Sequence, residues 1–237
     1  TFSLRSALAV VLAVTAAEIF SQGYWQRTFS AKNSETIKKA SLIAGFGAFV
    51  TILLLGFAGA VGAGKGIESP TLSFIEQFEL SPVLSVLLIV LCTLLVASSI
   101  DTLENAISST ISLDILKKGV KEAEYTTLGI VILAIIASTL VTNIFSVFLV
   151  ADLFATCLVF PTFYKLKTKS TDLFLLFPFI FSLLCVFIYR YLFVDLGNNP
   201  GGIFIPTDLY GLADLNTFLV GFLTSIFITV AYNRISK

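Results

Sequence analysis

The sequence contains no histidine and no methionine, one tryptophan and three cysteines among its 237 residues. Without histidine, neither a zinc site of the usual kind nor histidine-based acid–base catalysis is expected. Cys92, Cys157 and Cys185 each lie in an apolar stretch, where a free cysteine behaves as a small buried hydrophobe rather than as a disulfide partner or metal ligand. Because a nucleophile motif is also absent from the sequence, an enzyme is not expected.

Charge is scarce as well, since Asp, Glu, Lys and Arg make up 13% of the residues whereas 57% are hydrophobic, with a mean hydropathy of +0.96. A soluble domain of this length has no core large enough to bury that much apolar surface. Seven apolar stretches reach the length of about 20 residues that a bilayer crossing needs. They lie at about 4–25, 40–62, 82–113, 126–143, 145–164, 171–193 and 215–233. The sequence therefore predicts an all-α membrane protein with seven transmembrane helices in the lipid bilayer.

Local signals place several of the connections. Ser81 followed by Pro82 is a typical helix start, with serine as the N-cap and proline in the first turn. The fourth and fifth stretches meet near Asn143, which requires a tight turn. Gly23 offers a point at which the first stretch can break. Residues 197–214 are rich in glycine and proline, and we expect them to form a loop without spanning character.

The basic residues predict the orientation in the membrane. When the seven stretches alternate, most of the 15 Lys and Arg fall on one side: Arg27, Lys32, Lys38, Lys39, Lys117, Lys118, Lys121, Lys165, Lys167, Lys169, Arg234 and Lys237. The other side has Arg5, Lys65 and Arg190. The positive-inside rule then puts the N-terminus of the chain outside and the C-terminus in the cytoplasm, with the plasma membrane as the expected location. The clusters of basic residues are short and stand at helix ends. They therefore favour a role in setting membrane topology over a surface that binds nucleic acid or lipid headgroups.

The third stretch carries one polar stripe. At about 100° per helical residue, several polar side chains fall within about 80° of Ser98: Asp101, Thr102, Asn105, Ser108, Ser109 and Ser112. Glu104 stands at the border of this sector. One interpretation is an ion-binding face that looks into protein or water. The other is a long helix whose second half extends into the cytoplasm as an ordinary amphipathic face.

Two further acids lie in apolar surroundings. Glu18 shares helical spacing with Thr15, Ser21 and Gln22, just before the possible break, and broken helices at membrane depth often line a substrate site. The alternative is a helix that ends near the interface. Asp152 is either an interface acid near the outer end of its stretch or a site residue.

Three segments resemble the sodium:solute symporter family, close to its urea and polyamine transporters. They are "SQGYWQRTFSAKNSETIKKA" (21–40), "ASSIDTLENAISSTISLDI" (97–115) and "FPTFY" (160–164). The resemblance implies a leucine-transporter-type fold, in which residues 1–164 are the second five-helix inverted repeat and 165–237 are two peripheral helices. The N-terminal half of the transporter would then be missing, which agrees with a start at Thr1 and the absence of Met.

The resemblance also implies a function and a set of site residues. The function is cation-coupled uptake of a small polar solute, possible examples being urea or a polyamine, with sodium as the expected coupling ion, a proton as the alternative, and no other cofactor. The sodium ligands would be the hydroxyls of Ser98 and Ser99 and the carbonyl of Leu95. The residues expected to line the substrate site are Thr15, Glu18, Gln22, Asp101 and Asn105. A sugar is not expected, because Ala17 and Glu18 occupy the gate region. The competing hypothesis is a receptor-like or truncated membrane protein that transports nothing.

Overall fold

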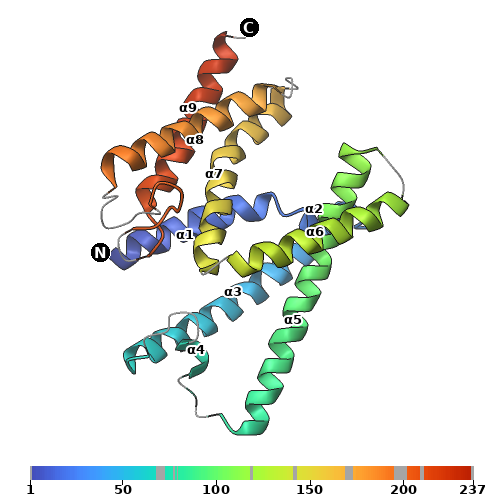
Figure 1. The fold of residues 1–237 in the computed structure, drawn as a ribbon, viewed down its shortest axis with the longest axis vertical. Coiled ribbons are helices and arrows are strands. Elements are labelled where there is room, and N and C mark those ends of the chain that lie inside the picture. The colour runs from blue at the N-terminus through green and yellow to red at the C-terminus, as the bar shows by residue number, and fades with distance from the viewer. Residues whose placement is uncertain are drawn as a thin grey trace. The chain divides into compact units, whose positions relative to one another are not determined.

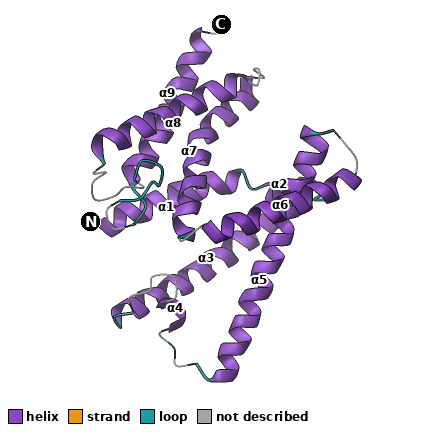
Figure 2. Cartoon of the chain, in the orientation of Figure 1, coloured by secondary structure: helices purple, strands orange, loops and turns teal. Residues whose placement is uncertain are grey.

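A computed structural model describes residues 2–67, 73–76, 78, 80–117, 120–140, 143–168, 173–194, 202–208 and 211–235. Over these ranges the chain is helical apart from turns, loops and an isolated bridge between Thr207 and Ala213 (Figures 1 and 2). Helices long and apolar enough to cross a membrane are Ser34–Gly64, Pro82–Ser112, Ile144–Thr168, Leu175–Phe193 and Leu215–Ile235. The predicted all-α class is thus confirmed for the described residues, and these five helices support a multi-pass membrane protein. The count of seven spans, the inverted repeat and the orientation stay predictions.

The chain divides into two compact units, Thr1–Ser21 with Leu133–Lys237, and Gln22–Ile132. The first unit contains α1 (Phe2–Ile19), α7 (Ile144–Thr168), α8 (Leu173–Phe193) and α9 (Leu215–Ile235). The second contains α2 (Gln22–Phe29), α3 (Ser34–Gly64), α4 (Ser73–Glu76), α5 (Pro82–Ser109) and the π-helix η1 (Thr110–Ile115). The division passes through α6 (Val120–Leu140). The predicted boundary at residue 164 concerns core and peripheral helices and stays a prediction.

Side-chain caps fix the starts of three helices. Ser81 Oγ accepts a hydrogen bond from Leu84 N at 3.4 Å, and Pro82 is the first residue of α5, as predicted. Asn33 Oδ1 accepts from Thr36 N at 2.8 Å at the start of α3. Asn143 Oδ1 accepts from Ser146 N at 3.3 Å at the start of α7. These short polar side chains satisfy backbone donors that the helix itself cannot satisfy.

The first apolar stretch is broken, but before Gly23 rather than at it. Helix α1 ends at Ile19, and the turn closes through bonds from Phe20 N to Ala17 O (2.9 Å) and from Ser21 N to Glu18 O (3.1 Å). Gly23 lies inside α2 and is buried, and a Cβ there would stand 3.2 Å from Thr102 Cγ2 on α5. The glycine therefore leaves room for the close approach of α2 to α5 and does not form the break.

In the first unit, α7, α8 and α9 pack through rows of buried residues spaced by four. The rows are Leu149, Leu153, Cys157 and Pro161 on α7, Pro178, Ser182, Val186 and Arg190 on α8, and Thr217, Gly221, Ser225 and Thr229 on α9. Rows of this spacing form the ridges by which helices interlock, and small residues in them let the backbones approach closely. At Gly221 a Cβ would lie 2.9 Å from Cys157 Sγ and 3.3 Å from Val186 Cγ2. The three helices therefore lie close together at this glycine.

Arg190, at the end of α8, is completely buried and holds the connection to α9 in place. Its Nε donates to the carbonyl of Gly202, its Nη2 to Thr207 O at 2.9 Å and its Nη1 to Thr217 Oγ1 at 2.7 Å. Asp214 Oδ2 lies 3.5 Å from Nη1 and accepts from Thr217 Oγ1 at 2.5 Å. The described part of the predicted Gly/Pro-rich loop is thus bound to the helices rather than loose.

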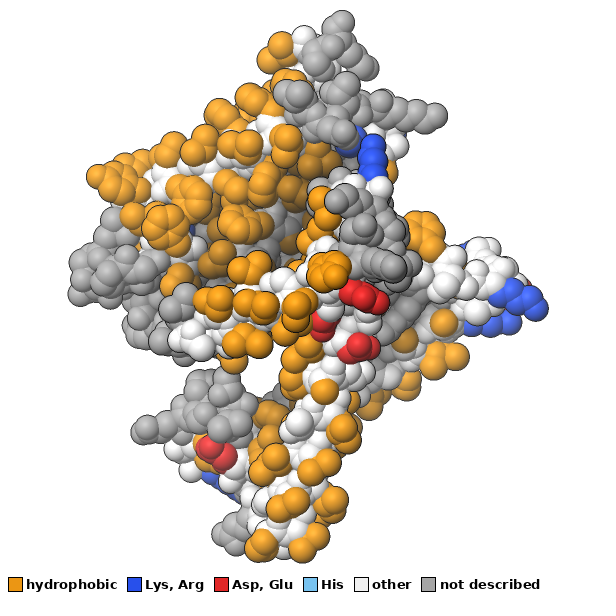
Figure 3. Space-filling model, turned by 45° about the vertical axis from the view of Figure 1, so that its right-hand side comes forward, with side chains coloured by type: hydrophobic (Ala, Val, Ile, Leu, Met, Phe, Trp, Pro, Cys, Tyr) orange, Lys and Arg blue, Asp and Glu red, His pale blue; other side chains and the backbone are white. Residues whose placement is uncertain are grey.

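In the second unit, α3 and α5 present apolar side chains on all sides. None of the most apolar 18-residue segment of either helix is buried by the described chain. Figure 3 shows hydrophobic side chains spread over much of the visible surface. A helix that is hydrophobic all round suits a membrane or the interior of a larger protein. These two helices therefore require lipid or further protein around them.

Candidate functional site

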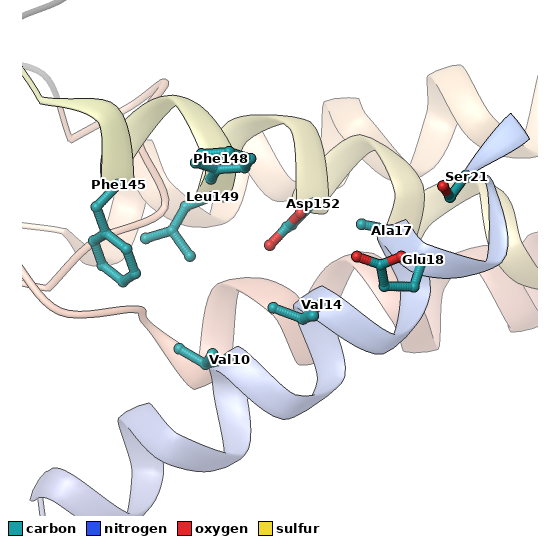
Figure 4. Close-up of a pocket in the computed structure, with 9 residues that line it drawn as sticks. All are labelled: Val10, Val14, Ala17, Glu18, Ser21, Phe145, Phe148, Leu149 and Asp152. Atoms are coloured by element: carbon teal, nitrogen blue, oxygen red, sulfur yellow. The ribbon is translucent and has the colours of Figure 1, made fainter. Parts of the chain in front are cut away.

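A cavity of about 370 Å³ lies between α1 and α7 of the first unit (Figure 4). Two helical stripes line it: Val10, Val14, Ala17 and Glu18 on α1, extended by Ser21 in the turn after it, and Phe145, Phe148, Leu149 and Asp152 on α7. Most of these side chains are apolar, whereas Glu18, Ser21 and Asp152 bring oxygen atoms to one end of the cavity. The cavity is therefore a largely apolar space with an acidic end.

The alanines of α1 explain why the two helices lie so close beside the cavity. Ala9 and Ala13 are fully buried, and both belong to a cluster that includes Leu149 and Leu153 of α7. Small side chains bring the helix axes together along this row. Val14 and Glu18 lie on a neighbouring row of α1, and this row borders the cavity.

Asp152 is 6% exposed, although its carboxylate points into the cavity (Figure 4). It lies about 12 Å along α7 from Ile144, at about 1.5 Å per residue, so it is well inside the helix rather than at its end. Among the described residues, no basic group and no hydrogen-bond donor pairs with this carboxylate, and Glu18 is the charged group that acts on it. The oxygens of Asp152 are open to the cavity, and the like charge of Glu18 makes an uncompensated negative charge there unfavourable.

Of the substrate residues predicted on the first stretch, the structure places only Glu18 at this cavity. Thr15 is exposed and is not among the residues that line the cavity. Gln22 is the first residue of α2 and belongs to the second unit. Ser21, which shares their predicted spacing, does line the cavity.

The N-terminal half of the polar stripe on α5 is bonded back to its own helix. Ser99 Oγ donates to Leu95 O at 3.0 Å, and Thr102 Oγ1 donates to Ser98 O at 3.0 Å. Asn105 Nδ2 donates to Asp101 Oδ1 at 3.3 Å. The side chains of these residues are exposed except that of Thr102, which is half-buried.

Of the three predicted sodium ligands, Ser99 Oγ and Leu95 O lie 3.0 Å apart on α5. A hydroxyl that donates its proton keeps lone pairs for a cation, so the bond from Ser99 to Leu95 is compatible with such a site. Groups of three or more Cys, Asp or Glu that could hold a metal ion do not occur in the described part of the chain. The sodium ligands and the roles of Asp101 and Asn105 stay predictions.

The C-terminal half of the stripe faces other helices of the second unit. Ser108 Oγ and Thr127 Oγ1 of α6 are 2.5 Å apart, and Ser112 Oγ donates to Thr126 Oγ1 at 3.4 Å. From α2, Gln26 Nε2 donates to Ser109 Oγ at 3.2 Å. The stripe is therefore a polar seam between helices over this part. The partners Gln26, Thr126 and Thr127 could not be singled out from the sequence.

The π-helix η1 overlaps the end of the polar seam, because Ser112 belongs to both. Ile111 O accepts from Leu116 N at 2.8 Å, and Ala106 O accepts from the hydroxyls of both Ser109 and Thr110, each at 2.9 Å. These hydroxyls compete for a carbonyl of the helix ladder, which favours a local change of helical pitch. Short π-helical segments within α-helices occur frequently at functional sites.

One curated protein similar to this chain is the spermidine transporter DUR31 of Candida albicans. The two sequences are 25% identical over 161 residues, which cover 62% of this chain and 30% of the relative. The chain thus spans less than a third of that transporter's length. No family model matches the sequence, and no solved structure matches it. The similarity and the five apolar helices together support a membrane transporter, whereas membership of the sodium:solute symporter family stays a prediction.

Proposed function

We propose that this protein is a secondary active transporter that couples entry of a cation, sodium, to uptake of a small polar nitrogenous solute such as a polyamine or urea. The observation that carries the proposal is the polar face of α5. An otherwise apolar membrane helix presents two acids and a row of hydroxyls on one side, and hydroxyls of α6 and an amide of α2 meet that side. Polar groups inside membrane helices usually face an ion or substrate pathway. The similarity to a spermidine transporter supports the same class of function.

The proposed coupling needs two conformations with different cation affinity. Oxygens of Ser98, Ser99 and Leu95 supply the cation site, and the cation favours the conformation in which this site is complete. Solute that binds to the same conformation is bound more tightly when the cation is present, and the reverse holds by linkage. The break between α1 and α2 and the π-helix after α5 give these helices places at which to bend.

Sodium dependence of uptake tests this proposal. In cells that lack their own polyamine uptake, the whole gene product containing this sequence should take up spermidine in a sodium-dependent manner. Ser98→Ala and Ser99→Ala should each raise the sodium concentration for half-maximal uptake by about tenfold, or about 1.4 kcal/mol of cation affinity. Thr93→Val is the matched control, because Thr93 also donates to a carbonyl of α5, that of Ile89, but lies off the polar stripe. Unchanged sodium affinity in both serine variants would contradict the cation site, and absence of any solute uptake would contradict the function.

A further inference from the structure

We propose that Asp152 and Glu18 form a recognition site for a protonated primary amine with a short alkyl chain. The transported solute is then an alkylammonium cation rather than a neutral nitrogen compound such as urea. This inference deepens the proposed function and rests on it. The observation that carries it is a carboxylate that is nine-tenths buried, aimed into a cavity and unpaired among the described residues, with a second carboxylate beside it (Figure 4).

The charge of the cavity requires a positive occupant. Asp152 is 6% exposed, and no Lys or Arg is among the described residues that line the cavity. Glu18 and Asp152 carry charges of the same sign and border the same cavity, so the two carboxylates repel each other. A cation bound between them removes this repulsion and supplies the missing hydrogen bonds, so cation binding gains from both effects.

The composition of the wall favours an alkylammonium group over a bare metal cation. The described lining offers side-chain oxygens from Glu18, Asp152 and Ser21, whereas its remaining side chains are apolar. A bare metal cation would contact the oxygens alone, whereas an alkylammonium ion would contact both parts of the lining. An ammonium group needs three acceptors for its three N–H donors, and two carboxylates with one hydroxyl match that number.

The rest of the cavity fits an alkyl chain. Val10, Val14, Phe145 and Leu149 extend away from the acidic end along both helices, as Figure 4 shows. Methylene groups of an amine that is anchored at Asp152 would lie against these side chains, which removes apolar surface from water. A volume of about 370 Å³ is near the lower end for small-molecule pockets, which suits a solute of few carbon atoms. A neutral solute would leave the buried carboxylate of Asp152 and the exposed one of Glu18 without a counter-charge.

Competition in the wild-type protein provides the first test. Uptake of radiolabelled butane-1,4-diamine by the whole gene product should be inhibited by butan-1-amine and much less by butanamide, a neutral molecule of similar size. An inhibition constant at least tenfold lower for the amine supports the site. Equal inhibition by amine and amide, or preferential uptake of urea, would overturn the inference and leave the transport function standing. Absence of uptake of both the diamine and urea would overturn the transport function itself.

Variants of the two acids provide the second test. Asp152→Asn should raise the KM for the diamine at least tenfold, Glu18→Gln should raise it several-fold, and Asp152→Glu should restore part of the affinity. Glu35→Gln is the matched control, because Glu35 is an exposed acid paired with Lys39 at 2.8 Å and lies away from the cavity. The amount of each variant at the cell surface is measured in parallel. If Asp152→Asn does not reach the membrane, the KM of Glu18→Gln for the diamine and the ratio of the inhibition constants of amine and amide in the wild-type protein test the inference instead.

The two carboxylates could also share a proton, and the same variants distinguish this case. A proton carrier would lose its pH dependence of uptake in Asp152→Asn but keep its preference for the amine over the amide. An ammonium site loses the preference itself. A variant that keeps both the wild-type KM and the wild-type preference would overturn the inference.

Discussion

Replacing Arg190 by alanine should lower the free energy of unfolding by about 3–5 kcal/mol, as for other buried charge pairs that lose one partner. The guanidinium is completely buried, and it donates to the carbonyls of Gly202 and Thr207 and to the hydroxyl of Thr217. Its removal leaves these acceptors without their donor and Asp214 without its counter-charge. Arg190→Lys should recover part of the loss, because a lysine restores the charge but not the fork of donors.

Titration of the purified protein with SDS in mixed micelles, followed by circular dichroism, measures this change. Arg5→Ala is the matched control, because Arg5 donates to Asn216 Oδ1 at 2.8 Å but at an exposed position. The control should change the unfolding free energy by less than about 1 kcal/mol. A similar small effect of Arg190→Ala would show that the buried network does not stabilise the fold.

Enlarging Gly221 should produce the second large effect. Even the Cβ of alanine would stand 2.9 Å from Cys157 Sγ, so Gly221→Leu must push α7, α8 and α9 apart, at a cost of about 1–3 kcal/mol or more. Gly221→Ala should destabilise less, and Cys157→Ala should rescue it because the opposing sulfur is removed. This coupling is expected because the two residues are in contact.

The same SDS titration measures the unfolding free energies of the glycine variants. Gly221→Ala, Cys157→Ala and the double variant together form a double-mutant cycle. Gly56→Ala on α3 is the matched control, because a Cβ there meets nothing within 4 Å in the described chain. The control should be neutral or stabilising, since alanine favours a helix over glycine by up to about 1 kcal/mol. If the changes in unfolding free energy of the two single variants add up to that of the double variant, α7 and α9 do not meet at this point.

The positions of the helices could be predicted well from the sequence, because apolar runs and caps are local features. Ser81 with Pro82 marks the start of α5 in the structure as in the sequence, and Asn143, near which a tight turn was expected, caps the start of α7. Gly23 was misassigned as a break because a glycine that permits close packing and a glycine that breaks a helix look alike in a sequence. Only the contact with Thr102 of α5 distinguishes the two.

The pairing of acids in the cavity was not predictable in the same way. Glu18 was a candidate because it stands in an apolar helix, but Asp152 could equally be an interface acid. Their common cavity depends on α1 lying against α7, which is far away in the sequence, and no local pattern reports such a contact. Arg190 was assigned to topology for the same reason, since its partners Gly202, Thr207 and Thr217 come from a loop and another helix.

The cavity beside Asp152 is central to the proposed transport, and its access to water and solute can be measured directly. With the three native cysteines replaced by alanine, Val14→Cys should react with a charged, water-soluble thiol reagent supplied on both sides of the membrane. Butane-1,4-diamine should slow the reaction. Val14 lines the cavity, whereas Val11, 63% exposed on α1 and absent from the lining, provides the control position. Reaction at Val14→Cys with protection by the diamine, and slow reaction at Val11→Cys, is the predicted result. An unreactive Val14→Cys, or equal reaction at both positions without protection, would contradict a solute pathway between α1 and α7.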